Sequence, residues 1–424
     1  MLCDMLYYTY GVSDVLTVQQ QTKGGRDMTH ENKFGMFVHW GFYAVTGVQE
    51  QVYARMDWDR ERYEALMHSF NPVKYDPEAW VLLAKSAGMK YICFTTKHHD
   101  GFCMWDTKYS DYNIMNTPYK KDVLRMLADA CAKHGMLLSL YYSIPDWHHP
   151  YGFNPASTHQ WKAVQRNDVN NEIYREYVKN QITELLTNYG PIYTLFWDIP
   201  PRIDDPSINA LVRSLQPGIK INDRGFDKGD FSTPEREYRS EDGGRFTRMT
   251  EACNSLGEQS WGYRANEDFY SIRHLTTSID RIMACGGSYL LNVGPDGEGV
   301  ITEEYAKRLR RVGDWYNRME GCLECSEPDP FNYSVKANKP IVTKKNGKSY
   351  FHFPDGIRSS SIAMQYFPNL PKSVRLLNTG ESLSAEMAYL PEYFSNGRAG
   401  LYLHVTGIPI DDLQSEPIVI EVEW

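Results

Sequence analysis

The residues of this chain that are able to do chemistry follow runs of apolar residues. Polar side chains close five such runs, at His39, His98–His99, Asp198, Asn222–Arg224 and Asn292. A β/α barrel displays its active site in this way, on the C-terminal ends of its parallel strands. The aspartate is the most informative of these residues, because Asp198 ends the strand-like run Tyr193–Asp198. We therefore predict an enzyme whose centre lies at the mouth of a barrel.

A pair of carboxyl groups is the chemistry that this arrangement favours. Hydrolysis of a glycosidic bond with retention needs one carboxylate that attacks the anomeric carbon and a second carboxyl that acts as acid and then as base. Asp198 suits the first role, and the alternative is an aspartate that caps the following turn. Glu235 and Glu251 are candidates for the second role, with Glu237 and Glu241 as weaker candidates. All four lie in a predicted loop region between two strands, and their spacing does not choose among them.

Three histidines also lie at predicted strand ends, namely His39, His98 and His99. A neutral imidazole donates and accepts hydrogen bonds, which suits sugar hydroxyls. The same residues support a rival hypothesis, a metal-dependent barrel hydrolase, because histidines on strand ends also bind zinc. Such a site needs spaced histidines and a carboxylate, so we favour hydroxyl binding and predict no metal. One histidine of the adjacent pair is alternatively a core residue.

Arg224 and Trp261 are further candidates for the pocket. The guanidinium of Arg224 offers a fork of donors that is able to hold a sugar hydroxyl or orient a carboxylate. Its alternative role is a salt bridge to Asp223 or Asp230. Trp261 is expected to form an apolar wall, with an ordinary core position as the alternative.

Strand and helix patterns alternate from Lys33 to about Cys322. This alternation predicts a parallel sheet with right-handed crossovers. The expected strands are Phe34–His39, Tyr91–Thr96, Met136–Tyr142, Tyr193–Asp198, Ile219–Asn222 and a last one through Leu290–Asn292. The expected helices include Asp122–His134, Asn170–Gly190 and Asp205–Gln216. Roughly seven strand candidates are visible where an ideal barrel has about eight. The predicted fold class is therefore α/β, a (β/α)8-like barrel, with an irregular barrel as a variant that the strand count allows.

The sequence pattern changes after Cys325. Short alternating runs separated by turn residues are typical of a β-sandwich, and they fall at Lys348–Phe353, Ser361–Tyr366, Ser373–Leu377, Gly400–Val405 and Ile418–Trp424. We therefore predict three parts: an N-terminal arm over residues 1–28, a catalytic β/α barrel over residues 29–325 and a C-terminal β-sandwich over residues 326–424.

The composition limits the function and the location. The net charge of −9 and the lack of a basic stripe argue against nucleic acid and anionic membranes as partners. The 8 cysteines are mostly scattered, and the single C-x-x-C, Cys322–Cys325, is interpreted as structural, which fits a reducing compartment. The first residues lack the basic leader and cleavage site of a secretory signal. A cytoplasmic location is the expectation.

Seven motifs together resemble the retaining α-L-fucosidase family, glycoside hydrolase family twenty-nine. They occur in the order of the family and cover the predicted barrel: Lys33–Gly41, Lys97–Phe102, Leu140–Ser143, Leu195–Asp198, Asn222–Arg224, Ser260–Tyr263 and Leu290–Pro295. The family's Glu-Trp pair after the first strand appears here as Glu50-Gln51.

The resemblance implies a role for individual residues. Asp198 is implied as the nucleophile, and the residues implied to bind substrate are His39, Glu50, His98, His99, Tyr141, Arg224 and Trp261. The position of the acid/base varies within the family. Glu251 is favoured, because it precedes the Ser260–Tyr263 segment as in members of similar layout, and Glu235 is kept as the rival.

The resulting hypothesis is an exo-acting retaining α-L-fucosidase that needs no cofactor. Its expected partner is a fucosylated oligosaccharide or glycoconjugate, and a homo-oligomer is possible. Two alternatives stay open at this point, the metal-dependent barrel hydrolase and a non-catalytic sugar-binding protein.

Overall fold

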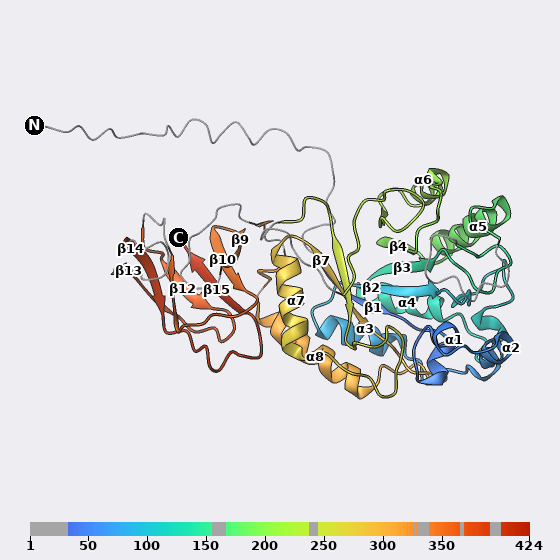
Figure 1. Ribbon diagram of the computed structural model, residues 1–424, viewed down its shortest axis with the longest axis horizontal. Helices are drawn as coiled ribbons and strands as arrows, with labels where there is room; N and C mark the ends of the chain where they lie inside the picture. The colour runs from blue at the N-terminus through green and yellow to red at the C-terminus, as the bar shows by residue number, and fades with distance from the viewer. Residues whose placement is uncertain are drawn as a thin grey trace, which may run out of the picture.

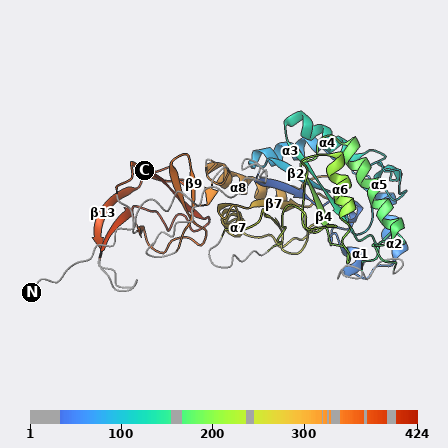
Figure 2. The same ribbon diagram turned by 90° about the horizontal axis from the view of Figure 1, so that it is seen from above.

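The protein is described by a computed structural model that covers residues 33–154, 167–236, 245–319, 321–324, 327–328, 339–364, 369–390 and 400–424. Two bodies lie side by side along the longest axis, a β/α barrel at one end and an all-β module at the other (Figures 1 and 2). The predicted N-terminal arm, Glu237, Glu241 and Cys325 lie outside the described residues.

Seven parallel strands form the wall of the barrel. They are β1 (Phe34–Val38), β2 (Tyr91–Lys97), β3 (Leu137–Ser143), β4 (Thr194–Asp198), β5 (Lys220–Ile221), β6 (Glu251–Ser255) and β7 (Ser288–Val293). Their order in the sheet is β5-β4-β3-β2-β1-β7-β6. All the predicted strands are confirmed. The strand β6 was not predicted, because its residues had been assigned to a long loop.

Residues 230–236 close the gap that this order leaves between β5 and β6. On one side Asp223 N donates to Phe231 O over 2.8 Å, and on the other side Glu251 N donates to Ser232 O over 2.8 Å. Parallel bridges join Asn222 to Phe231 and Glu235 to Cys253. The segment therefore takes the place of an eighth strand, although it is joined to its neighbours only by isolated bridges. An irregular barrel is what the sequence predicted.

Eight α-helices lie in the described part of the chain, and all but the first and the last begin after a residue whose side chain caps the helix. They are α1 (Val52–Arg55), α2 (Arg60–Glu64), α3 (Pro77–Ser86), α4 (Val123–His134), α5 (Glu172–Asn188), α6 (Pro206–Leu215), α7 (Ile272–Ala284) and α8 (Glu303–Arg318). Asp76, Asp122 and Asp205, for example, each accept a hydrogen bond from a backbone N–H of the first turn. The predicted helices are confirmed to within a few residues.

The C-terminal module is the predicted β-sandwich. One sheet has the order β12-β15-β10-β9-β8 and the other the order β11-β14-β13. The strands are β8 (Glu327–Pro328), β9 (Ile341–Lys345), β10 (Lys348–Phe353), β11 (Ser361–Met364), β12 (Ser373–Leu376), β13 (Ser384–Leu390), β14 (Gly400–Thr406) and β15 (Ile418–Glu423). Phe351, Met364 and Leu403 belong to one buried core that joins the two sheets. The predicted domain boundary at residues 325–326 lies outside the described residues and stays a prediction.

The sandwich packs against the barrel through α7 and α8, which lie between the two bodies in both views (Figures 1 and 2). His352 Nδ1 and Asp280 Oδ1 are 2.8 Å apart, and both side chains are fully buried. Thr277 Oγ1 also donates to Pro354 O over 3.1 Å. These polar contacts, of which the first is fully buried, fix the position of the sandwich relative to the outer helices.

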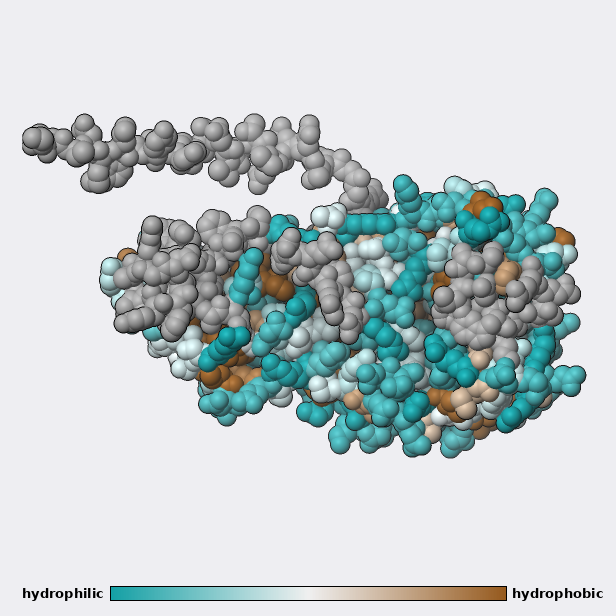
Figure 3. Space-filling view, in the orientation of Figure 1, coloured by the Kyte–Doolittle hydropathy of each residue, from teal (hydrophilic) through white to brown (hydrophobic). Residues whose placement is uncertain are grey.

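The visible face of the barrel is mainly hydrophilic, and its hydrophobic residues are scattered in small groups (Figure 3). Within the part of the chain that the structure describes, no helix combines the length and the apolar character needed to span a bilayer.

Candidate active site

A pocket at the C-terminal ends of the barrel strands brings together most of the residues selected from the sequence. It is lined by Phe37, His39, Gln51, His98, His99, Tyr141, Phe196, Asp198, Ile199, Arg224, Glu235, Cys253 and Trp261. Two of the selected residues, Glu50 and Glu251, are not among its lining residues. Their positions are described below.

Asp198 ends β4 and is held by donors on both of its oxygens. Tyr141 Oη donates to Oδ2 over 2.7 Å, while Arg224 Nη1 and the backbone N–H of Ile199 donate to Oδ1 over 3.1 and 3.0 Å. Burial alone would raise the pKa of Asp198, but the positive charge of Arg224, the nearby His99 and these hydrogen bonds outweigh it and hold the pKa below its ordinary value. The group is therefore an oriented carboxylate at neutral pH, as a nucleophile must be.

Arg224 joins Asp198 to a second carboxylate. Its Nη1 atom lies 3.1 Å from Asp198 Oδ1 and also 3.1 Å from Glu235 Oε2. The two carboxylate oxygens are therefore no farther apart than twice that distance. Carboxyl groups are separated by about 5–5.5 Å in retaining glycosidases and by about 6.5–9.5 Å in inverting ones. The spacing of Asp198 and Glu235 fits the retaining class.

Glu251 lies at the other end of the barrel, which argues against the role that the sequence favoured for it. It is the first residue of β6, whereas the pocket lies at the ends of the strands. Its side chain is fully buried, and its Oε2 accepts a hydrogen bond from Tyr91 Oη over 2.7 Å. A carboxyl in this position does not reach a sugar in the pocket. The choice of Glu251 over Glu235 as the acid/base is corrected here on that ground.

The buried Glu251 has a consequence for stability. Burial raises its pKa to about 7, with the hydrogen bond from Tyr91 opposing the shift. An unfolded chain has a glutamate pKa of about 4.3. The folded state therefore binds the proton more tightly, and the stabilisation is complete below about pH 4.3 and is lost as the pH rises to about 7.

We expect Glu251→Gln to flatten the pH dependence of the free energy of unfolding between pH 5 and pH 7. The wild type should lose on the order of 3 kcal/mol more than the variant over this range. Chemical denaturation at several pH values measures the difference, and turnover of an aryl fucoside should be retained. Equal slopes for the two proteins would show that Glu251 is ionised in the folded state.

His39 presents an unprotonated nitrogen to the pocket. Asn292 Nδ2 donates to Trp261 O over 2.7 Å, so Asn292 Oδ1 is the atom that accepts from His39 Nδ1 over 2.7 Å. The proton of a neutral ring is then on Nδ1, and Nε2 is a hydrogen-bond acceptor. Burial lowers the pKa of His39 to about 4, despite the charge of Glu50 nearby. The ring is therefore neutral at pH 7 and suited to accept from a sugar hydroxyl.

Replacing His39 by alanine is expected to weaken the binding of fucose. A lost buried hydrogen bond costs roughly 1–3 kcal/mol, which corresponds to about a 5- to 150-fold rise in Kd. The loss should be the same at pH 5.5 and pH 7.5, because His39 stays neutral above its pKa. Calorimetry with free fucose measures it, with His134→Ala, on the outer helix α4, as the control. An unchanged Kd would exclude this contact.

His99 faces the nucleophile from the end of β2. Ser143 Oγ donates its only hydrogen to Pro145 O, so it accepts from His99 Nδ1 over 2.7 Å. The Nε2 atom of His99 then lies 3.7 Å from Asp198 Oδ2. The neighbouring His98 ring is nearly parallel to the Tyr141 ring, with 5.8 Å between the ring centroids. The two histidines therefore both line the pocket, because β2 has ended before them.

Glu50 lies behind the pocket, where it supports the segment that carries Trp261. Its Oε2 accepts hydrogen bonds from Ser260 Oγ, Trp261 N and Gly262 N over 2.9, 3.0 and 2.9 Å. The structure thus gives Glu50 a role in positioning this segment, and the implied contact with sugar hydroxyls stays a prediction. The Trp261 ring stands 5.2 Å from the His39 ring and forms a wall of the pocket.

Sequence reasoning did not select five of the lining residues, Phe37, Gln51, Phe196, Ile199 and Cys253. Gln51 was noticed only as the residue that follows Glu50. Ile199 has a φ of +59°, which is uncommon for a β-branched residue, and nothing in the sequence indicated it. The left-handed conformation brings its backbone N–H to Asp198 Oδ1. Ile199 therefore helps to orient the carboxylate.

The grouping of the three histidines bears on the rival hypothesis of a metal site. Among the residues that the structure describes, no three or more His, Cys, Asp or Glu side chains are arranged to hold a metal ion. His39 and His99 each use Nδ1 in a hydrogen bond within the protein, to Asn292 and to Ser143.

The arrangement of an arginine-linked carboxylate pair among three histidines has known relatives. A family model described as alpha-L-fucosidase matches residues 17–320 of the chain. The chain belongs to the α-L-fucosidase family. The tissue alpha-L-fucosidase of Rattus norvegicus is 27% identical over 363 residues, which are 77% of this chain and 76% of the rat protein. The plasma alpha-L-fucosidase of Homo sapiens is 27% identical over 313 residues, 67% of this chain and 66% of the human protein.

Solved fucosidase structures share both domains of the fold. Alpha-L-fucosidase isoenzyme 1 from Paenibacillus thiaminolyticus has a TM-score of 0.78 and 31% identity, with coverage of 93% of this chain and 97% of that chain. A family twenty-nine α-L-fucosidase from Bacteroides thetaiotaomicron has a TM-score of 0.74 and 26% identity, with coverage of 93% and 96%. That structure is a trapped covalent intermediate with 2-fluoro-fucosyl fluoride. This chain is accordingly a glycoside hydrolase, a retaining α-L-fucosidase, and the prediction of the family is confirmed.

Proposed function

We propose that Asp198 is the nucleophile and Glu235 the acid/base of this fucosidase, which acts on terminal fucose of oligosaccharides or glycoconjugates. The observation that carries the assignment is the position of Arg224 Nη1, 3.1 Å from an oxygen of each carboxylate. In the first step Asp198 attacks the anomeric carbon while Glu235 gives its proton to the departing oxygen. The product is a β-linked fucosyl ester on Asp198, because the attack inverts the carbon.

The second step uses the same groups in reverse. Glu235, now a carboxylate, removes a proton from water, and the water attacks the anomeric carbon and displaces Asp198. Two inversions return the α configuration. Asp198 carries no charge while it is an ester, so Glu235 is then the only anionic partner of Arg224 in this pair. The ion pair with Arg224 therefore holds Glu235 beside the ester at the moment when a base is needed.

The other lining residues account for the preference for fucose. His39 offers an acceptor for a hydroxyl, and Arg224 offers donors. Phe37, Phe196 and Trp261 supply apolar ring surface, against which the 6-methyl group of fucose is expected to pack. A hexose with a hydroxymethyl group would bring an additional hydroxyl toward these rings without a partner there, which is costly.

A panel of nitrophenyl glycosides tests the proposal. Turnover should be confined to the α-L-fucoside, and proton NMR of the first product should show α-L-fucose before mutarotation. Fucosylated oligosaccharides of different linkage then define the preferred aglycone. A first product with the β configuration would contradict the retaining assignment of the two carboxylates.

A further inference from the structure

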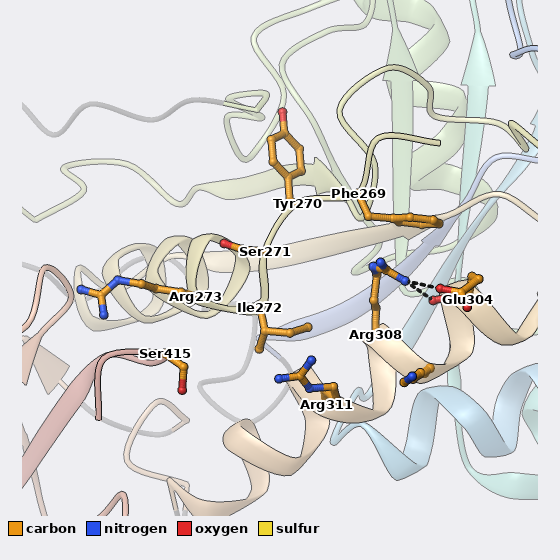
Figure 4. A pocket seen from close by; sticks show the side chains of 10 residues that line it. Phe269, Tyr270, Ser271, Ile272, Arg273, Glu304, Arg308, Arg311 and Ser415 are labelled. Carbon is orange, nitrogen blue, oxygen red and sulfur yellow. Dashed lines mark hydrogen bonds and ion pairs between the residues drawn. The ribbon is translucent and has the colours of Figure 1, made fainter. Parts of the chain in front are cut away.

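A second recess lies on the outside of the barrel, between the start of α7, the first turns of α8 and the sandwich (Figure 4). Its volume is about 460 Å³. None of its lining residues is shared with the fucose pocket. A recess of this size is in the range that small-molecule sites occupy, roughly 300–1,000 Å³, and is larger than an inorganic ion needs.

The recess is strongly cationic on a protein whose net charge is −9. Arg273, Lys307, Arg308 and Arg311 line it, and the single acidic residue of the lining is Glu304. Within the same helix Glu304 pairs with Arg308 over 2.7 Å. No acidic residue of the lining is therefore left to neutralise the other three cations.

The other three cations of the lining are not paired with a carboxylate of the described residues. Arg273 donates to the backbone oxygens of Gln414 and Asp355, which carry no net charge. Lys307 and Arg311 are exposed, and neither forms an ion pair with any carboxylate of the described residues. Arg311 projects from α8 toward the start of α7, while Arg308 lies between Phe269 and Glu304 (Figure 4). Several cations around one recess favour a ligand with an anionic group.

The same chain segment forms a wall of this recess and a wall of the fucose pocket. Residues 256–270 leave β6, carry Trp261 into the fucose pocket, and return with Phe269 and Tyr270 in the recess. Tyr270 N donates to Leu256 O over 3.0 Å, and Glu258 N donates to Asp268 O over 2.9 Å, so the two limbs of the segment are held together. Helices α7 and α8 also begin at the catalytic end of the barrel, because each one follows a strand that ends there.

We propose that this recess binds the sulfate or carboxylate group of an acidic oligosaccharide, at a site separate from the fucose pocket. The anionic group would lie among Arg273, Lys307 and Arg311. The choice of a sugar as the carrier of the charge rests on the proposed function, whereas the choice of an anion rests on the recess alone.

The test uses the full-length enzyme and four probes. These are sulfated and sialylated N-acetyllactosamine, both without fucose, neutral N-acetyllactosamine, and inorganic sulfate. The variant Lys307→Ala/Arg311→Ala removes two charges from the recess. The control Lys133→Ala/Arg310→Ala removes two exposed charges elsewhere, which pair with Glu78 and Glu303. Calorimetry at low and at physiological salt measures binding, and thermal melting confirms that the variants fold.

We expect at least one acidic sugar to bind the wild type and the control equally, and the recess variant at least about tenfold more weakly, which is about 1.4 kcal/mol. The neutral sugar should not bind, and salt should weaken the interaction. The comparison of the sulfated with the sialylated probe identifies the anionic group. Equal losses in both double variants, or no binding of either acidic sugar, would overturn the proposal. Inorganic sulfate that binds as tightly as the sugars would overturn the oligosaccharide assignment.

Turnover of nitrophenyl fucoside separates this proposal from the catalytic one. It should be the same in the wild type and both double variants, because the recess shares no residue with the fucose pocket. Failure of the recess to bind acidic sugars leaves that turnover unaffected, while an error in the catalytic assignment would appear in the variants of Asp198 and Glu235.

Discussion

Asp198→Asn is expected to reduce the turnover of every fucoside by on the order of 10⁴-fold or more, with the fold intact. The amide is isosteric but is not a nucleophile, and it cannot hold the negative charge that Arg224 and Tyr141 now stabilise. Steady-state kinetics with nitrophenyl fucoside measures the loss. Asp129→Asn, on the exposed side of α4, is the matched control and should keep full activity.

Azide distinguishes the nucleophile from a residue that only binds substrate. In Asp198→Ala the removed carboxylate leaves space on the face of the sugar opposite the leaving group. Azide that enters this space attacks the substrate directly, so the rescued product should be the β-fucosyl azide. Near-normal activity of a clean Asp198→Asn preparation, or rescue that gives the α-azide, would contradict the assignment.

Glu235→Ala is expected to slow the hydrolysis of natural fucosides by about 10²–10⁴-fold, the usual contribution of general acid catalysis. The kcat/KM for dinitrophenyl fucoside should fall far less, because this leaving group departs without a proton. Azide should raise kcat by attacking the fucosyl ester on Asp198, and the product should then be the α-fucosyl azide. The alkaline limb of the pH–rate profile should also disappear, since that limb reports loss of the proton of the acid.

Glu251→Gln serves as the control for this series. Its side chain contacts Tyr91 at the end of the barrel where the strands begin, so none of these signatures should appear. If the leaving-group dependence and the α-azide were found with Glu251→Gln and not with Glu235→Ala, the structural assignment of the acid/base would have to be reversed.

The sequence was sufficient to predict which residues at the ends of regular strands meet in the pocket. Asp198, His39 and Arg224 follow apolar runs, and parallel strands bring such ends to one face, so these residues were predicted to meet before the fold was known. The pocket contains all three. The sandwich was likewise predicted, because its alternating strands and turn residues have a strong sequence pattern.

The acid/base could not be selected in the same way. The strand β6 reads Glu-Ala-Cys-Asn-Ser and lacks the β-branched and aromatic residues that indicate a strand, so Glu251 was placed in a loop. The segment that carries Glu235 contains Pro234 and joins its neighbours by isolated bridges, which leave no periodic pattern. Glu50 illustrates a different limit, because hydrogen bonds to Ser260 and Gly262 depend on contacts that spacing does not reveal.

The irregular closure of the barrel at residues 230–236 has an evolutionary consequence. The nucleophile is built into a regular strand, where an inserted or deleted residue would shift the register of the whole wall. Glu235, in contrast, is carried by a segment outside the seven regular strands, which isolated bridges join to its neighbours. The chain is able to change length there while the seven strands stay in place. Such a fold permits the proton donor to occupy different sequence positions in different relatives while the attacking carboxylate stays at the end of the same strand.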